Sequence, residues 1–498
     1  RVFHHRQYRQ FREFAPPGAH LLMAPGTEFA FASISEIDRL YRRRKLSPVE
    51  LTRDILDRIE SLNPRLNAYI TVAAEQAMAQ ARTAEAELFA RKGRRCDRGP
   101  LHGIPISLKD NIYTREIRTT AGSKILREFL PPRDAPVVTA LKRGGSIILG
   151  KTNMHEFAYG VTTENPHYGA AHNPWDLGRT PGGSSGGSAA ALAAGLCFGS
   201  IGTDTGGSIR IPAALCGVVG LKPGLGRVDT EGVVPLSRTL DFVGPLARTV
   251  EGAALLLEAI CVHKKRERRM LPSKSPSLRG RRLRLGIPQE FFFDVVSPEV
   301  QSSFESALEV LRKRGAGIEN VTLPLVSESE DAGNQIAWAE ATLYHQDSGW
   351  FPARSEEYGE DVRSRLEMGS RVSAVQYLRA LEFRERFIAS LRATMLDRKL
   401  DALIVPTTPV AAPRIGEENI SIDNRAHLAR ALLLRLNRPA NLAGVPAISV
   451  PCGLTKDGLP IGLQFIGVLA GEAALLEFAL HFEQASSWNA RPKLDFLD

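Results

Sequence analysis

The chain has 498 residues, of which 43% are hydrophobic and 24% are charged, and its net charge is +9. This composition is typical of a globular protein with a large apolar core, and the length alone corresponds to two to four domains of ordinary size. No stretch approaches the roughly 18 consecutive apolar residues that a membrane-spanning helix needs, so no such helix is expected.

The five cysteines are odd in number and widely separated, and none forms a CxxC pair. This pattern favours free thiols in a reducing compartment over disulfides or metal ligands. We therefore expect a cytoplasmic protein. The cysteines are Cys96, Cys197, Cys216, Cys261 and Cys452.

Positive charge concentrates in two segments, the N-terminus and the run that begins at His263 and continues to Arg282. Residues 1–22 lack regular periodicity, and we expect residues 1–30 to be a disordered or non-native extension, with a transit peptide as the alternative. The second run has no interleaved aromatic residues. It therefore favours a solvated loop over a nucleic-acid patch.

Helix signals begin at Ser33, which forms a capping box with Glu36. A stronger start follows at residues 47–50, where a capping serine precedes proline at the first helical position and glutamate at the third. We expect this second helix to end at Asn63 and Pro64, because proline interrupts a helix.

The remaining pattern alternates strands with helices, which predicts an α/β fold with a large mixed sheet. No internal repeat or clear linker is present, so we expect a single large domain over residues 31–490. Strands are expected at 68–72, 104–109, 147–149, 198–202, 283–287 and 402–405, with a hairpin of 447–451 and 459–466. Helices are expected at 73–89, 137–143, 189–196, 298–314, 372–396 and 471–484.

Two glycine-flanked serine clusters lie within residues 180–210, joined by an apolar segment that a flexible linker would lack. Residues 182–187 satisfy the G-x-S-x-G pattern, but a nucleophile elbow must follow a buried strand directly, and residues 175–181 are not one. A phosphate-binding loop would end in Gly-Lys-Ser/Thr, and neither cluster does. Both of these alternatives are disfavoured.

Ser208 lies in a more informative context. The successive main-chain amides of residues 205–208 run into a helix start and can form a cup of donors for an oxyanion. No histidine has a motif context nearby, so a lysine of depressed pKa is the candidate base. Lys109 lies in an apolar strand and is the natural candidate. The alternative is a surface lysine paired with Asp110.

These motifs resemble those of the amidase signature family. The resemblance covers roughly residues 33–490 and is long and specific. It is carried by residues 103–111 (GIPISLKDN), 182–189 (GGSSGGSA), 202–213 (GTDTGGSIRIPA), 216–223 (CGVVGLKP), 443–451 (AGVPAISVP) and 459–464 (LPIGLQ).

The resemblance implies one large amidase-signature domain with a mixed β-sheet core covered by helices on both faces. It implies a Ser–Ser–Lys triad in which Ser208 forms the acyl-enzyme, Ser184 bridges and Lys109 is the base. It further implies a cis peptide bond at the bridging serine and no metal or organic cofactor. The oxyanion hole and substrate-binding main chain would come from Thr205, Gly206, Gly207 and Ser208.

Two functions follow from the resemblance. The first is an amidase that releases ammonia or an amine from a small-molecule amide. The alternative is the glutamine-hydrolysing A subunit of an aminoacyl-tRNA amidotransferase, which works with partner subunits. That component usually carries a Tyr/Phe-Asp-Gly-x-Arg-Tyr-Gly stretch, whereas residues 339–350 here read AEATLYHQDSGW. This departure favours the first function.

The motifs leave the substrate open. We expect its pocket walls to come from residues 320–380 and 437–446. A homodimer is left open, a membrane partner is not expected, and nucleic acid is expected only if the chain serves a tRNA amidotransferase.

Overall fold

The computed structural model describes residues 29–90, 96–262, 283–467 and 471–494. The expected N-terminal extension, except for its last two residues, and the whole basic run of residues 263–282 therefore lie outside the described residues. Within the described residues, no helix is long and apolar enough to cross a membrane. Cys96, Cys197, Cys216 and Cys452 are free thiols, as the sequence predicts.

Among the described residues, eleven strands form one mixed sheet in the order β1-β3-β2-β6-β8-β7-β14-β15-β11-β9-β10. β2 runs parallel to both β3 and β6, whereas β8, β7, β14 and β15 pair antiparallel in succession. The predicted α/β class with a large mixed sheet is confirmed. The strands are β1 (Tyr69–Val72), β2 (Pro105–Lys109), β3 (Ile147–Thr152), β6 (Gly199–Asp204), β7 (Val219–Lys222), β8 (Phe242–Ala247), β9 (Arg284–Pro288), β10 (Gly317–Val321), β11 (Ala402–Pro406), β14 (Ala447–Leu454) and β15 (Pro460–Gly467).

Helices pack on both faces of this sheet, and sheet glycines allow the close approach. A Cβ on Gly199 would lie 2.6 Å from Leu256 of α7, whereas a Cβ on Gly202 would lie 2.8 Å from the Ser185 hydroxyl, just before α5. Because residues 199 and 202 differ by an odd number, they point to opposite faces of β6. The helices of this core are α5 (Gly186–Ala193), α6 (Arg210–Cys216), α7 (Val250–Ile260), α8 (Pro298–Lys313) and α14 (Gly471–Ser486).

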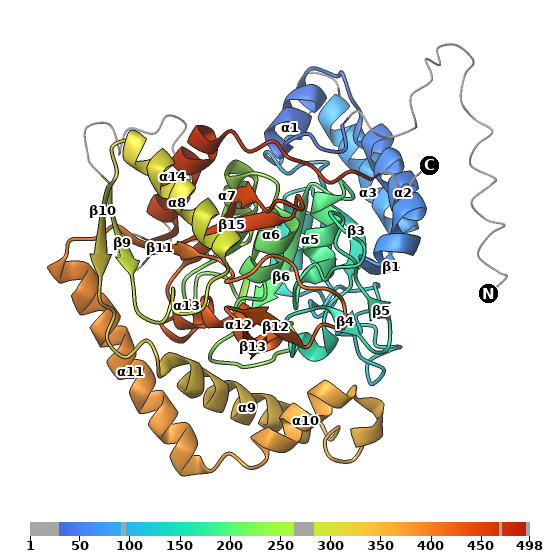
Figure 1. The fold of residues 1–498 in the computed structure, drawn as a ribbon. Helices are drawn as coiled ribbons and strands as arrows, with labels where there is room; N and C mark the ends of the chain where they lie inside the picture. Colours follow the sequence, from blue (N-terminus) through green and yellow to red (C-terminus); the bar gives the residue numbers. More distant parts are fainter. Residues whose placement is uncertain (1–28, 91–95, 263–282, 468–470, 495–498) are drawn as a thin grey trace.

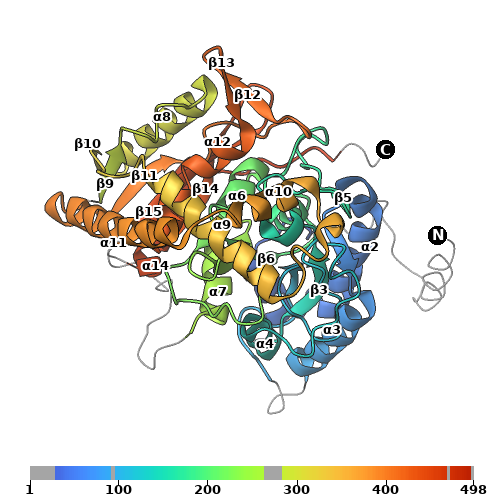
Figure 2. The same ribbon diagram turned by 90° about the horizontal axis from the view of Figure 1, so that it is seen from below.

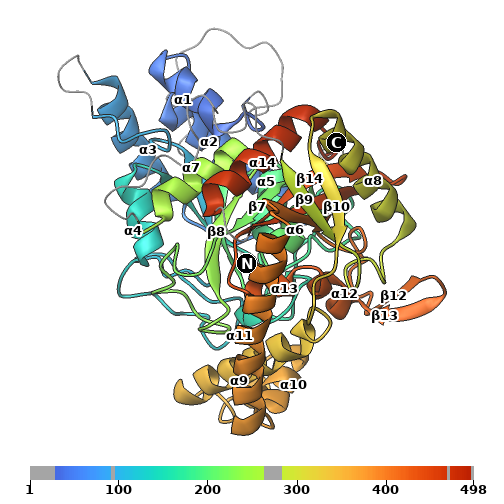
Figure 3. The same cartoon turned by 90° about the vertical axis from the view of Figure 1, so that its left-hand side faces the viewer.

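The N-terminal helices pack beside the β1 end of the sheet, and three later helices form a separate group at another side (Figures 1 and 3). Seen from below, α9 of that group lies in front of the strands (Figure 2). The N-terminal helices are α1 (Ile34–Arg42), α2 (Pro48–Leu66), α3 (Ala74–Phe89) and α4 (Pro136–Arg143). The later group is α9 (Ser329–Asp347), α10 (Glu360–Gly369) and α11 (Ala374–Asp397).

The remaining elements are short. Two small hairpins, β4 (Glu164–Asn165) with β5 (Gly169–Ala170) and β12 (Asn419–Ile422) with β13 (Arg425–Leu428), lie outside the main sheet. Helices α12 (Ala429–Arg435) and α13 (Arg438–Leu442) follow the second hairpin. These last two helices approach the site described below.

Most element predictions are confirmed, including both capping boxes and the C-terminal hairpin. Several boundaries differ by one to three residues, and two of these differences have a clear physical cause. α2 continues past Pro64 to Leu66 and ends at Asn67, which has a left-handed backbone. A proline in the last turn removes only its own N–H bond, so the turn can still close, and the amide of Asn67 donates to the carbonyl of Asn63 at 2.7 Å.

The second difference is at α5, which begins at Gly186 rather than three residues later. Its glycines fit a very close contact. A Cβ on Gly187 would lie 2.4 Å from the carbonyl of Asn153 and 2.5 Å from that of Ala68. The low helix propensity of glycine is therefore overridden by packing.

Candidate active site

Three segments meet at one edge of the sheet. β2 and β6 are parallel neighbours, so their C-terminal ends lie together and bring Lys109 close to Thr203. The loop before α5 reaches the same place, where the amide of Ser185 donates to the carbonyl of Ser208 at 3.1 Å. The serine clusters and the predicted lysine are thus neighbours in space.

Lys109 is fully buried. Its Nζ lies 2.7 Å from the Ser184 hydroxyl and 2.7 Å from the Thr203 hydroxyl. Burial lowers the pKa of Lys109 to about 7, although the negative charges of Asp241 and Asp204 oppose the shift. A large fraction of this amine is therefore neutral near neutral pH, and a neutral amine can accept a proton.

The alternative that Lys109 is a surface lysine paired with Asp110 is wrong. Successive strand residues point to opposite faces, and both faces of β2 are buried. The Asp110 carboxylate instead accepts a hydrogen bond from the amide of Thr120 at 3.0 Å, and its charge acts on a second buried lysine, Lys151.

The loop that carries Ser184 is held from several sides. The Gly183–Ser184 peptide bond is cis, as expected from the resemblance. The carbonyl of Ser184 accepts from the amide of His155 at 3.2 Å. A Cβ on Gly183 would lie 2.9 Å from the main-chain nitrogens of residues 162 and 163, so only glycine fits this approach without a shift of the neighbouring backbone.

The loop that carries Ser208 is anchored by Asp204. One carboxylate oxygen accepts from the amide of Gly207 at 2.7 Å, and the other accepts from the amide of Ile209 at 3.1 Å. The amide of Gly207 is therefore engaged in this structure. Within the described residues, the amides of Thr205, Gly206 and Ser208 donate to no acceptor. Those three amides are the ones left for an oxyanion.

Asp204 itself belongs to a fully buried ion pair with Arg210, whose guanidinium lies 2.9 Å and 3.0 Å from the two carboxylate oxygens. Gln464 and Asn441 accept further hydrogen bonds from the same guanidinium. Burial alone would raise the pKa of Asp204, but the charge of Arg210 holds it below its ordinary value. The carboxylate therefore stays ionised and keeps the loop in place.

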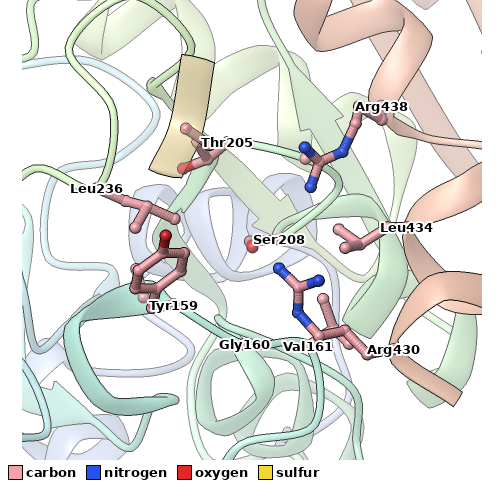
Figure 4. Close-up of a pocket in the computed structure, with 12 residues that line it drawn as sticks. Tyr159, Gly160, Val161, Thr205, Ser208, Leu236, Arg430, Leu434 and Arg438 are labelled. Carbon is pink, nitrogen blue, oxygen red and sulfur yellow. The ribbon is translucent and has the colours of Figure 1, made fainter. Parts of the chain in front are cut away.

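Ser208 borders a pocket together with its loop neighbours Thr205 and Gly206 (Figure 4). The opposite walls come from the segment 158–161 and from α12 and α13. In Figure 4 the guanidinium groups of Arg430 and Arg438 turn toward the space beside Ser208. The other lining residues are Ala158, Tyr159, Gly160, Val161, Leu236, Ala337 and Leu434.

Sequence reasoning placed some of these walls and missed others. Ala337 and Arg438 fall in the two regions from which walls were expected, but Arg430 does not. Thr203 and Arg210 were also missed as site residues. Thr203 is one residue before Asp204 at the end of a recognised strand, and that position was a usable signal. No local motif distinguishes Arg430 from other arginines of the chain.

The family model for amidases matches residues 50–476. The chain belongs to the amidase family. It is 43% identical over 492 residues to the A subunit of the glutamyl-tRNA(Gln) amidotransferase of Syntrophobacter fumaroxidans, a match that covers 92% of this chain and 98% of that protein. The single-domain α/β fold and the hydrolysis of carbon–nitrogen amide bonds follow from this membership.

Solved structures with the same fold support this family assignment. One belongs to a vestigial protein complex that reveals the evolutionary origins of an s-triazine catabolic enzyme. The match between this chain and that structure has a TM-score of 0.85 at 35% identity, and it covers 93% of this chain and all of that chain. The A subunit of the glutamyl-tRNA(Gln) amidotransferase of Thermotoga maritima matches with a TM-score of 0.77 at 34% identity, over 94% of this chain and 98% of that one.

Proposed function

We propose that this amidase hydrolyses a small carboxylic amide through an acyl-enzyme on Ser208, with Ser184 and Lys109 as its proton relay. The observation that carries the proposal is the 2.7 Å contact between a fully buried Lys109 and the Ser184 hydroxyl. A lysine acts as a base only when its ammonium is destabilised, and burial supplies that here.

The relay runs in balanced steps. Neutral Lys109 accepts the proton of the Ser184 hydroxyl, while Ser184 accepts the proton of Ser208 as the Ser208 oxygen bonds to the amide carbon. The oxyanion receives hydrogen bonds from the free main-chain amides of residues 205, 206 and 208, and such a donor contributes about 3 kcal/mol to barrier lowering. The proton then passes through Ser184 to the leaving nitrogen, and the carbon–nitrogen bond breaks. Water repeats the sequence on the ester and releases the carboxylate.

The experiment is ammonia release, measured over aliphatic, aromatic and carboxylate-bearing amides, with hydroxylamine present to trap the acyl-enzyme as a hydroxamate. Ser208→Ala and Ser184→Ala should abolish both products. Ser188→Ala is a matched control, because Ser188 is equally buried in the same motif but bonds Thr152 at 2.7 Å. Hydroxamate formation by Ser208→Ala would refute the nucleophile.

A second candidate function is supported by the curated relatives. Those at 36–43% identity are named as the A subunit of a glutamyl-tRNA(Gln) amidotransferase, which favours a glutamine-hydrolysing component of a complex over a stand-alone enzyme. The departure at residues 339–350 favours the stand-alone enzyme. Glutamine hydrolysis that appears only with partner subunits and aminoacyl-tRNA would establish the component of a complex, and turnover of another amide by the isolated chain would establish the stand-alone amidase.

A further inference from the structure

Two arginines face the pocket beside Ser208 without a protein counterion. Arg438, at the start of α13, is only 5% exposed, and Arg430 is half-buried on α12. The Nε atoms of both are buried and have no hydrogen-bond partner. Over the ranges that the structure describes, neither guanidinium makes an ion pair. A guanidinium stays charged in proteins, so two positive charges face this pocket without direct contact to a described carboxylate, although the fields of Asp361 and Glu330 act on them.

The nearby carboxylates are committed elsewhere. Asp361 lies 2.7 Å from Nε2 of His155 and 2.8 Å from Nη1 of Arg365. Asp241 accepts from the Thr205 hydroxyl at 2.5 Å and from two main-chain amides. Glu330 acts on Arg438 only through its field, without an ion-pair contact between the described side chains.

Arg438 is fixed close to the reacting loop. A Cβ on Gly206 would lie 3.5 Å from its Nη2, and a Cβ on Gly333 of α9 would lie 2.7 Å from its Cδ. The stem therefore packs tightly against α9, and the head group lies against the loop that presents Ser208. An anion bound there would be separated from the scissile amide by a short spacer.

Burying an unpaired charge is costly, and a planar guanidinium matches a carboxylate with two parallel hydrogen bonds. Among the residues that the structure describes, no acidic side chain lines this pocket, so these residues offer no carboxylate to receive an ammonium group. We propose that Arg430 and Arg438 bind a carboxylate of the substrate, and that the preferred substrates are monoamides of short dicarboxylic acids without an α-ammonium group. This inference rests on the proposed function and names the substrate class of that same site.

The test compares substrates of one shape and different charge. We expect succinamate or glutaramate to have a kcat/KM at least about 10-fold above butanamide, pentanamide and glutamine, because a hydrogen bond to a charged group is worth a factor of that order. Glutarate and succinate should inhibit competitively. A higher kcat/KM for glutamine than for glutaramate, or for the neutral amides than for the anionic ones, would overturn the inference.

Variants separate binding from folding. Arg438→Met and Arg430→Met should each raise KM for the anionic amide on the order of 10- to 100-fold, with little change for pentanamide, and Arg438→Lys should restore part of the loss. Arg435→Met is the matched control, since Arg435 is on the same helix as Arg430 but pairs with Asp294 at 3.1 Å. Equal losses on charged and neutral amides would refute carboxylate binding. Ser208-dependent hydrolysis of neutral amides would then leave the proposed function standing, whereas no hydrolysis of any amide would refute both.

Discussion

The burial of Lys109 predicts a specific dependence of stability on pH. Its pKa falls from the ordinary 10.5 to about 7 in the folded chain. Between these values the unfolded chain binds more protons than the folded chain, so stability rises with pH in this window. The linkage relation gives a cost of burying this group of about 4 kcal/mol at pH 7, which falls to about 1 kcal/mol near pH 9.5.

The perturbation is Lys109→Met, which removes the titrating group and keeps an apolar chain of similar length. Denaturant unfolding of wild type and variant at the two pH values should give a wild type that gains about 3 kcal/mol relative to the variant as pH rises. The other titrating groups cancel in this difference. Lys456→Met, at an exposed position, should give no such change. If wild type and Lys109→Met respond equally to pH, Lys109 is charged in the folded chain and the proposed base is wrong.

Three further predictions follow from the same contacts. Because the proposed base Lys109 must be neutral to accept a proton, kcat/KM should rise with pH and level off above about 7. The charge of Asp241 raises the pKa of Lys109, so Asp241→Asn should move the midpoint of this pH profile to lower pH. An unchanged pH profile in the variant would contradict this interaction between Asp241 and Lys109. Asp204→Asn leaves a buried arginine without its counterion and should destabilise the fold by about 3–5 kcal/mol in thermal or denaturant unfolding. Gly187→Ala forces a Cβ to 2.4 Å from a backbone carbonyl, and in denaturant unfolding it should lower the free energy of unfolding by about 3 kcal/mol, the upper end of the usual cost of overpacking. Gly144→Ala, where the nearest atom is at 3.4 Å, should have a free energy of unfolding within about 1 kcal/mol of wild type.

Local patterns in the sequence were sufficient for most of the fold. The capping boxes of α1 and α2 depend on residues three positions apart, and the strands followed from apolar runs bounded by turns. The start of α5 did not follow, because Gly186 and Gly187 read locally as helix breakers. What places them in a helix is the backbone of residues 68 and 153, which only the folded chain brings there.

The residues of the candidate site also fall into two groups, those that local sequence motifs could indicate and those that they could not. Ser184, Ser208 and Lys109 could be proposed from the sequence because each lies in a distinctive motif, and the structure brings Lys109 and Ser184 into contact. Arg430 was not predicted, and Arg438 was covered only by a region expected to line the pocket, because both lie more than 200 residues from Ser208 in sequence. Their importance comes from the absence of a counterion among the described side chains, which is a property of the three-dimensional arrangement and not of any local pattern.

The alternation of side-chain directions along β6 explains how a lysine with a lowered pKa and an ionised carboxylate coexist at this site. Thr203 and Asp204 are successive strand residues and point to opposite faces. The neutral hydroxyl of Thr203 therefore meets Lys109 at 2.7 Å, while the carboxylate of Asp204 meets Arg210. A carboxylate in direct contact with Lys109 would stabilise its ammonium and remove its basicity. Because Asp204 pairs with Arg210, its negative charge anchors the loop that carries Ser208. Burial is then the dominant influence on the pKa of Lys109.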